Sequence, residues 1–336
     1  MDKPIDLSNK TIIISRTDSI GDVILTLPMC AWIKEQFPTC KLLFLGKKYT
    51  KPVVDCFKAV DDFLTLDSLD ELPVPARIQK IKSWKADVFI HVFPNKELAK
   101  MVKKAGVPIR VGTSHRSYHL LTCNYKVNFS RKSANEHESQ LNFHLLKPIG
   151  CKVLPGLDEL SAYFERFKPN NQEFIFEKLN TNLKKVVLHP KSKGSALEWE
   201  MDNFVKLAKQ LANQDCLVFF SGTEQEGASF RGKIPTNKNI IDISGKFSLD
   251  EFIVFLNQVD ALVACSTGPL HLAAILGKKA IGLYTEQRPM HPGRWKPVGK
   301  HVEIISDSSK FNAKSNEKHY LNISVNEVLN KVIKRE

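Results

Sequence analysis

The chain has 336 residues, of which 43% are hydrophobic and 25% are charged, and its formal net charge is +13 at pH 7. This composition is typical of folded globular proteins and excludes fibrous and intrinsically disordered classes, and the length suits two domains of ordinary size. The excess of positive charge favours an anionic partner.

The first ten residues are polar, and no later run approaches the roughly eighteen apolar residues of a membrane-spanning helix. We therefore expect a cytoplasmic protein. The seven cysteines are scattered singly, without a Cys-x-x-Cys pair, so we expect neither a metal site nor a disulfide framework. The chain has no Gly-x-Gly-x-x-Gly fingerprint and no P-loop, which argues against dehydrogenase and kinase classes, and we expect no cofactor.

Short β-rich runs alternate with amphipathic segments in the first half of the chain, which is typical of βα units around a parallel sheet. The predicted strands cover residues 11–15, 41–45, 87–92 and 109–112. A parallel sheet collects the loops that follow its strands at one edge, so these loops are the first place to look for functional residues.

The loop after the first predicted strand, residues 15–22, carries the carboxylates of Asp18 and Asp22. It precedes the apolar segment 23–37, so we expect Asp22 in the opening turn of a helix, where N–H groups and the helix dipole keep a carboxylate ionised. Such a group can accept a proton from a substrate hydroxyl. An ordinary acidic residue at a helix start is the alternative, and Asp18 competes with Asp22 for the role.

Residues 96–132 hold much of the excess charge, with nine lysines and arginines against one acidic residue, Glu97. Such a field favours a phosphorylated glycolipid, an acidic membrane surface or nucleic acid, and a solvated basic face is the alternative. The chain shows no helix-turn-helix, zinc-finger or RNA-binding aromatic motif, so we do not expect a nucleic-acid partner. The basic residues are Lys96, Lys100, Lys103, Lys104, Arg110, Arg116, Lys126, Arg131 and Lys132.

Residues 151–184 are rich in Pro, Asn, Lys and Glu and mark a domain boundary, after which the βα pattern restarts. We therefore predict an α/β fold with two Rossmann-like, doubly wound parallel-sheet domains over residues 1–168 and 169–322. Residues 323–336 form a C-terminal helix that we expect to pack back on the first domain, with Ser324 as N-cap. The further predicted strands are 185–189, 216–221, 240–243, 261–264 and 280–283, and the predicted helices are 201–213, 248–258 and 269–277.

Two loops of the second half carry groups suited to a nucleotide diphosphate. In residues 188–199, Lys191 and Lys193 supply charge and Ser195 a hydroxyl, which together could neutralise a departing diphosphate; a flexible basic loop is the alternative. The loop 221–226 ends in Glu226, whose carboxylate could accept hydrogen bonds from ribose hydroxyls, although a Glu at a helix start is commonplace.

The loop that opens the segment 266–277 is the most informative. It follows the apolar run 261–265, and Thr267 and Gly268 can form a tight turn before Pro269, which suits a first helical position. Exposed N–H groups and the positive end of the helix would attract an anion, and we predict a diphosphate there. An ordinary strand-turn-helix corner is the alternative.

Two segments carry a resemblance to a known family. Residues 19–28 read Ser-Ile-Gly-Asp-Val-Ile-Leu-Thr-Leu-Pro, and residues 266–277 read Ser-Thr-Gly-Pro-Leu-His-Leu-Ala-Ala-Ile-Leu-Gly. In this order they resemble the two signatures of the lipopolysaccharide heptosyltransferases of glycosyltransferase family 9, with similarity over roughly residues 11–300. The resemblance implies a GT-B fold, with the acceptor bound by the first domain and the nucleotide-sugar by the second.

The resemblance also implies a reaction: inverting, metal-independent transfer of heptose from ADP-heptose to the inner core of lipopolysaccharide, with Asp22 as general base. The acceptor is then an anionic glycolipid, which implies peripheral contact with the cytoplasmic face of the inner membrane. The implied acceptor-binding residues are Ser19, Lys100, Lys103 and Lys104. The implied donor-binding residues are Lys191, Lys193, Ser195, Glu226, Ser266, Thr267, Gly268, Pro269, Leu270 and His271.

Two positions depart from the family pattern. Heptosyltransferases of this family commonly have Asp where this chain has Ser266, and Lys two residues before the loop tryptophan, where this chain has Leu197. A family relative that transfers another sugar from a different nucleotide, and a non-catalytic GT-B scaffold, are therefore alternatives.

Overall fold

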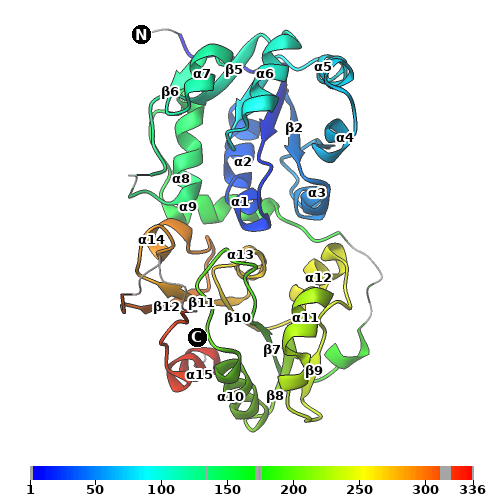
Figure 1. Cartoon of the computed structure of the whole chain (residues 1–336), viewed down its shortest axis with the longest axis vertical. Helices are drawn as coiled ribbons and strands as arrows, with labels where there is room; N and C mark the ends of the chain where they lie inside the picture. Colours follow the sequence, from blue (N-terminus) through cyan, green and yellow to red (C-terminus); the bar gives the residue numbers. More distant parts are fainter. Residues whose placement is uncertain (1–2, 133–134, 171–173, 175, 311–318, 335–336) are drawn as a thin grey trace. The chain divides into compact units, whose positions relative to one another are not determined.

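The computed structural model describes residues 3–132, 135–170, 174, 176–310 and 319–334. The chain divides into two compact units, residues 1–168 and 169–336 (Figure 1). Each unit is built on a six-stranded parallel sheet with helices in the crossover connections. The predicted α/β class, with two Rossmann-like domains, is confirmed.

The first sheet has the strand order β3-β2-β1-β4-β5-β6. All four strands that the sequence predicts are confirmed, with each end within one residue of its expected place. The sequence does not predict the two edge strands, because runs of four and three residues are too short to show a β period. The strands are β1 (Thr11–Ser15), β2 (Lys41–Gly46), β3 (Asp62–Thr65), β4 (Val88–His91), β5 (Ile109–Thr113) and β6 (Tyr125–Val127).

The helices of the first unit differ in how far they are buried, and α6 is amphipathic, with one buried face. In α6, for example, the side chain of Asn95 caps the helix start by accepting the N–H of Leu98 at 3.0 Å, and Leu98 and Val102 are buried. The helices are α1 (Ile20–Ile24), α2 (Leu27–Gln36), α3 (Lys51–Asp55), α4 (Asp67–Asp70), α5 (Val74–Ser83), α6 (Lys96–Lys104), α7 (Ser117–Thr122), α8 (Glu138–Phe143) and α9 (Leu157–Ala162), with 3-10 helices η1 (Lys48–Thr50), η2 (His144–Ile149) and η3 (Tyr163–Arg166).

The second sheet has the order β12-β11-β10-β7-β8-β9. Its five predicted strands are confirmed to within two residues at each end. The edge strand β12 is not predicted, because Glu303 and Ser306 interrupt its apolar pattern. The strands are β7 (Lys184–His189), β8 (Cys216–Phe220), β9 (Ile240–Asp242), β10 (Ala261–Cys265), β11 (Lys279–Thr285) and β12 (Val302–Asp307).

The helices of the second unit include the three that the sequence predicts before residue 300. They are α10 (Met201–Ala212), α11 (Glu224–Phe230), α12 (Leu249–Leu256), α13 (Gly268–Ile275), α14 (Pro292–Trp295) and α15 (Val325–Ile333), with 3-10 helices η4 (Glu177–Leu179) and η5 (Arg231–Lys233). No helix within the described residues combines the length and apolarity needed to cross a membrane.

The C-terminal helix α15 forms as predicted and contributes to the second core. Its apolar residues Val328, Leu329 and Val332 belong to the core of the second unit, where they pack with α10. Packing of this helix on the first domain stays a prediction. Ser324 occupies the N-cap position as predicted, but its side chain makes no capping hydrogen bond.

Trp199 ties the loop after β7 to the C-terminal segment. Trp199 is 1% exposed, and its ring packs edge-on against that of Phe204 with 4.9 Å between the ring centroids. Its Nε1–H donates to the carbonyl of Ile323 at 3.0 Å. The N–H of Leu321 donates to the carbonyl of Glu198 at 2.9 Å. The carboxyl end of the loop is thus fixed to a packed segment.

Candidate functional site

The predicted functional loops follow the central strands of each sheet, where the order in which strands are added reverses. In the first sheet the chain winds outward in opposite senses from β1 and β4, and in the second from β7 and β10. Ligands bind α/β sheets at such switch points, beyond the carboxyl ends of the strands. The loops 15–22, 188–199 and 266–277 leave β1, β7 and β10 respectively, so each unit presents its conspicuous residues at its own switch point.

In the first unit, Asp22 lies in the opening turn of α1, as the sequence predicts. One carboxylate oxygen accepts a hydrogen bond from Nη2 of Arg16, and the other accepts one from the hydroxyl of Ser19 at 2.5 Å. The side chain is 16% exposed. A carboxylate held in this way stays oriented while one edge remains accessible.

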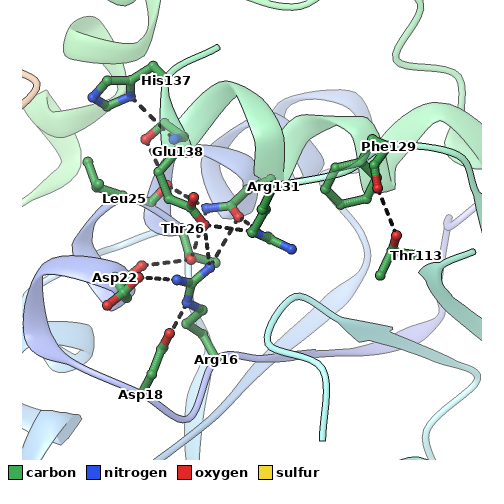
Figure 2. Close-up of polar contacts among 12 residues, drawn as sticks. Arg16, Asp18, Asp22, Leu25, Thr26, Thr113, Phe129, Arg131, His137 and Glu138 are labelled. Carbon is green, nitrogen blue, oxygen red and sulfur yellow. Dashed lines mark hydrogen bonds and ion pairs between the residues drawn. The ribbon is translucent and has the colours of Figure 1, made fainter. Parts of the chain in front are cut away.

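Arg16 is the centre of a buried polar network (Figure 2). Its side chain is 3% exposed, and Nε donates to Asp18 at 2.7 Å. Nη1 donates to Glu138 at 3.1 Å and to the side-chain oxygen of Asn142 at 3.3 Å, while Nη2 pairs with Asp22. Burial by itself would lower the pKa of Arg16, but the three carboxylates outweigh it and raise that pKa.

The two aspartates of this loop differ in environment. Burial raises the pKa of Asp18 to about 6, and the nearby charge of Asp22 adds to the rise, although Arg16 acts in the opposite direction. Tyr49 donates its hydroxyl to the backbone carbonyl of Asp18 at 2.7 Å. Asp18 therefore takes up a proton at mildly acidic pH while it remains attached to Arg16.

In the second unit, Glu198 organises the loop after β7. Its Oε1 accepts the N–H and the hydroxyl of Ser192 at 3.0 and 3.2 Å, and its Oε2 pairs with Nζ of Lys191 at 3.2 Å. The charge of Lys191, which the sequence assigns to a diphosphate, is thus already partnered. Lys193 makes no ion pair among the described residues, and it and Gly194 both have positive φ, which turns the loop sharply.

The loop after β10 leads into α13, which begins one residue earlier than predicted, with Thr267 at the N-cap, Gly268 as the first helical residue and Pro269 as the second. The hydroxyl of Thr267 is buried and has no hydrogen-bond partner within the described residues. Leu270 is fully buried in the core and His271 is 3% exposed. The start of α13 therefore combines free N–H groups with an unsatisfied hydroxyl, an arrangement suited to an anion.

Ser266 connects this loop to its neighbours. Its carbonyl accepts the hydroxyl of Ser195 at 3.2 Å, which joins the loops after β7 and β10. Its side chain hydrogen-bonds Tyr284, whose hydroxyl donates to the carbonyl of Trp295 at 2.8 Å. Burial raises the pKa of Tyr284 above its ordinary value. Ser266, where the family resemblance implies an Asp, is therefore uncharged and tied to a neutral phenol.

Glu226, which the sequence predicts to bind ribose hydroxyls, caps a helix in the structure. Its Oε2 accepts the N–H and the hydroxyl of Thr223 at 2.7 and 2.9 Å, which completes a capping box at the start of α11. His189, at the end of β7, shares a hydrogen bond of 3.0 Å with the hydroxyl of Ser221. Burial lowers the pKa of His189 to about 4, so this histidine is neutral at pH 7.

The lysines predicted to bind the acceptor lie apart from Asp22. Helix α6 runs back from the carboxyl end of β4 toward the start of β5, and Nζ of Lys103 donates to the carbonyl of Leu121 at 2.8 Å. Lys103 and Lys104 therefore lie near the starting edge of the sheet, and Lys100 lies midway along α6. Asp22 follows the opposite edge, a strand length of about 15 Å away.

Sequence reasoning misses several residues of both networks. Arg16 carries a local signal, since it directly follows the apolar run 11–15 and precedes the carboxylates of Asp18 and Asp22 by two and six residues. Glu138 carries none, because it lies 122 residues away in the chain. Arg131, one of the basic residues of the segment 96–132, donates to Glu138 at 2.8 Å. Among the described residues, no group of three or more His, Cys, Asp or Glu side chains is arranged to hold a metal ion.

Known proteins resemble the chain over most of its length. The model of glycosyltransferase family 9 (heptosyltransferase) matches residues 76–323. A Haemophilus influenzae protein whose name proposes a glycosyltransferase activity and specifies no sugar is 27% identical over 313 residues, covering 89% of this chain and 90% of that protein. The lipopolysaccharide core heptosyltransferase OpsX of the same organism is 21% identical over 324 residues, covering 90% and 86%.

Among solved structures, E. coli ADP-heptose lps heptosyltransferase II superimposes with a TM-score of 0.72 at 15% identity, and the match covers 96% of this chain and 97% of that one. At this identity the likeness shows the fold, which is that of the GT-B glycosyltransferases.

The raised pKa of Asp18 predicts a pH-dependent stability. The folded chain keeps a proton on Asp18 between about pH 4 and 6 that the unfolded chain has released, so the free energy of unfolding falls as the pH rises through this window. We expect Asp18→Asn to remove that loss and to raise the free energy of unfolding relative to wild type by about 1 to 2 kcal/mol at pH 7.5, but not at pH 4.

Urea unfolding at several pH values measures this difference, and Asp67→Asn is the control of opposite sign. The N–H of Lys48 donates to Asp67 at 2.6 Å and lowers the pKa of that carboxyl. The stabilisation by Asp67 is therefore present at neutral pH and lost as the pH falls through its lowered value, so Asp67→Asn should destabilise at pH 7.5. A gain from Asp18→Asn that is equal at pH 4 and 7.5 would contradict the assignment.

Proposed function

This chain belongs to glycosyltransferase family 9, and we propose that it transfers heptose from ADP-heptose to the inner core of lipopolysaccharide with Asp22 as the general base. The observation that carries the proposal is the position of Asp22. Its carboxylate lies in the first turn of α1 at the switch point of the first sheet, oriented by Arg16 and Ser19. An oriented, partly accessible carboxylate is suited to remove a proton from a sugar hydroxyl.

In the proposed reaction, Asp22 takes the proton of the acceptor hydroxyl as that oxygen attacks the anomeric carbon of the donor. The new carbon–oxygen bond forms while the bond to the diphosphate breaks, and ADP leaves with the bonding electron pair, so the configuration at the anomeric carbon inverts. The hydroxyl of Ser19 lies 2.5 Å from Asp22 Oδ2. We propose that the acceptor hydroxyl takes this place and that Ser19 then orients the acceptor.

On the donor side, the start of α13 receives the diphosphate. The N–H groups at the helix start and the buried hydroxyl of Thr267 offer hydrogen-bond donors whose direction is already set, so little reorganisation is needed as charge develops on the leaving group. Lys193 supplies the positive charge, because Lys191 is partnered by Glu198. These residues provide for a leaving diphosphate without requiring a metal ion.

A different sugar remains the second candidate. The neutral pair of Ser266 and Tyr284 stands where related heptosyltransferases commonly have a carboxylate, so the hydroxyls of the donor sugar meet fewer strong acceptors here. Transfer of another sugar from a different nucleotide would keep the same base and the same diphosphate site.

Calorimetric titration with ADP, UDP and GDP tests the donor class. We expect selective binding of ADP, because the names of related proteins specify ADP-heptose. A preference for UDP or GDP would keep the transferase and replace the sugar. If none of the three binds, either alone or with a lipopolysaccharide acceptor present, the non-catalytic scaffold replaces the enzyme.

Substitution of the two aspartates identifies the base. We expect Asp22→Asn to lower kcat by about 100-fold or more, because the amide cannot accept the proton, and to leave ADP binding unchanged, because the diphosphate site lies in the other unit. Asp18→Asn should keep kcat within about tenfold of wild type. The reverse pattern would make Asp18 the base.

We further propose that the exposed end of α6 contacts an anionic membrane surface. Leu120 and Leu121 are 53% and 75% exposed, and Lys103 is hydrogen-bonded to Leu121, so apolar side chains and positive charge occupy one patch. Such a patch suits a bilayer with acidic lipids. In this proposal Lys100, Lys103 and Lys104 bind the surface that carries the acceptor, rather than the sugar that receives heptose.

Vesicle binding tests this surface. Replacement of Lys100, Lys103 and Lys104 by Glu should weaken co-sedimentation with phosphatidylglycerol-containing vesicles, most clearly at low salt. It should spare turnover of a deacylated, water-soluble acceptor. The matched control places the same three charge reversals on exposed residues of the second unit, Lys206, Lys209 and Lys238. Equal losses in the two triple variants would attribute the effect to net charge and reject the patch.

A further inference from the structure

We propose that Arg16 is a positioning residue for Asp22, and that Glu138 and Asn142 of α8 fix Arg16 so that this helix governs the direction and basicity of the base. The inference rests on the proposed role of Asp22. It concerns contacts within the first unit alone, so it does not depend on which sugar is transferred.

The donor pattern of Arg16 supports the first step. A guanidinium is planar and presents its N–H groups in a fixed fork. In Arg16 the three nitrogens engage three different carboxylates: Nε engages Asp18, Nη1 engages Glu138 and Nη2 engages Asp22. The Arg16 side chain is 3% exposed, so water has little access to the guanidinium. With the other two carboxylates in place, the direction in which Arg16 meets Asp22 is determined.

Helix α8 fixes the other side of Arg16. The carboxylate of Glu138 is fully buried, and its Oε1 accepts both Arg16 at 3.1 Å and Arg131 Nε at 2.8 Å. The side-chain oxygen of Asn142 accepts Arg16 at 3.3 Å and Arg131 Nη2 at 2.8 Å. Figure 2 shows the two guanidinium groups converging on the same stretch of α8.

The contacts close into a ring through α1. Nδ2 of Asn142 donates to the carbonyl of Leu25 at 3.0 Å, and Leu25 is the C-cap residue of the helix that carries Asp22. The hydroxyl of Thr26 in turn donates to the carbonyl of Asp22 at 2.8 Å. Contacts with α8 therefore position both the side chain and the backbone of Asp22. A shift of α1 or α8 would break several of these hydrogen bonds together.

The charges of the ring set how strongly Asp22 is held. Two arginines, Arg16 and Arg131, face three carboxylates, so Arg16 is not available to Asp22 alone. Glu138 draws on the same guanidinium, and its negative charge offsets part of the field that Arg16 exerts on Asp22. Removal of Arg16 and removal of the Glu138 charge should therefore have opposite effects on proton uptake at Asp22.

Other groups near Asp22 contribute less. From η1, Tyr49 faces the aspartate loop, and burial raises its pKa, with Asp18 and Asp22 adding to the rise, so it is neutral over the working range. From α3, Lys51 and Asp55 form an exposed pair with each other. Asp18 lies within the ring itself, and its protonation near pH 6 is common to all variants that retain it.

The pH dependence of kcat tests the proposal. In Arg16→Met the acid limb should move up by about one pH unit, because the ionised base has lost its cation, and kcat at the optimum should fall at least tenfold. In Glu138→Gln the acid limb should move down. Arg16→Lys keeps the charge but loses the fork, so its acid limb should stay while kcat falls. The KM for the donor should remain within about twofold throughout.

Two further variants guard against a purely structural effect. Arg16→Met combined with Glu138→Gln removes one charge of each sign, so the double variant should regain the fold and return the acid limb toward wild type. Arg166→Met is the matched control in the same unit, since Arg166 pairs with Glu35 in a partly exposed ion pair. An acid limb at the same pH in wild type, Arg16→Met and Glu138→Gln would overturn the proposal.

A titration without turnover separates this inference from the proposed function. Carbon-13 NMR of the aspartate carboxyls, with the Asp22 signal assigned through Asp22→Asn, reports proton uptake at Asp22 whether or not any sugar is transferred. Opposite displacements in Arg16→Met and Glu138→Gln support the ring even if no donor is turned over. If the Asp22 signal titrates at the same pH in both variants of an active transferase, the positioning role of Arg16 is rejected and the proposed function is retained.

Discussion

Parallel strand pairing is the constraint on which both units depend. A parallel pair needs a crossover connection, so every strand of both sheets delivers its following loop to the same edge. Where the winding reverses, between β1 and β4 and between β7 and β10, neighbouring loops diverge and leave room for a ligand. Asp22 and the start of α13 lie where they do because each follows a strand at such a reversal.

The two switch points differ in their electrostatics. In the first unit, buried Arg16 pairs with the buried Glu138 and with two partly exposed aspartates, so the direction of Asp22 is fixed through Arg16. In the second, the charge of Lys191 is offset by Glu198 and His189 is neutral, so what the start of α13 presents is mainly hydrogen-bond donors. In the proposed function, the first arrangement gives the base its direction, and the second offers a leaving diphosphate donors that are already oriented.

Contacts within each unit give structural partners to residues that stand out in the sequence. Glu226 completes a capping box at the start of α11, and Arg131 donates to the buried carboxylate of Glu138. The C-terminal helix contributes Val328 and Val332 to the second core.

The sequence by itself determined nine of the twelve described strands, the two-domain α/β class, the family and the segments that form the loops, because hydrophobic period and turn residues act over a few positions. It also predicted Asp22 in a first helical turn and a tight turn at Thr267 and Gly268 before a helix. Only the tertiary structure decided that Glu138, Arg131 and Asn142 converge on Arg16, that Glu198 takes up Lys191, and that the α6 lysines lie far from Asp22. Those outcomes depend on which distant segments pack together, and no local pattern encodes the partner of a buried charge.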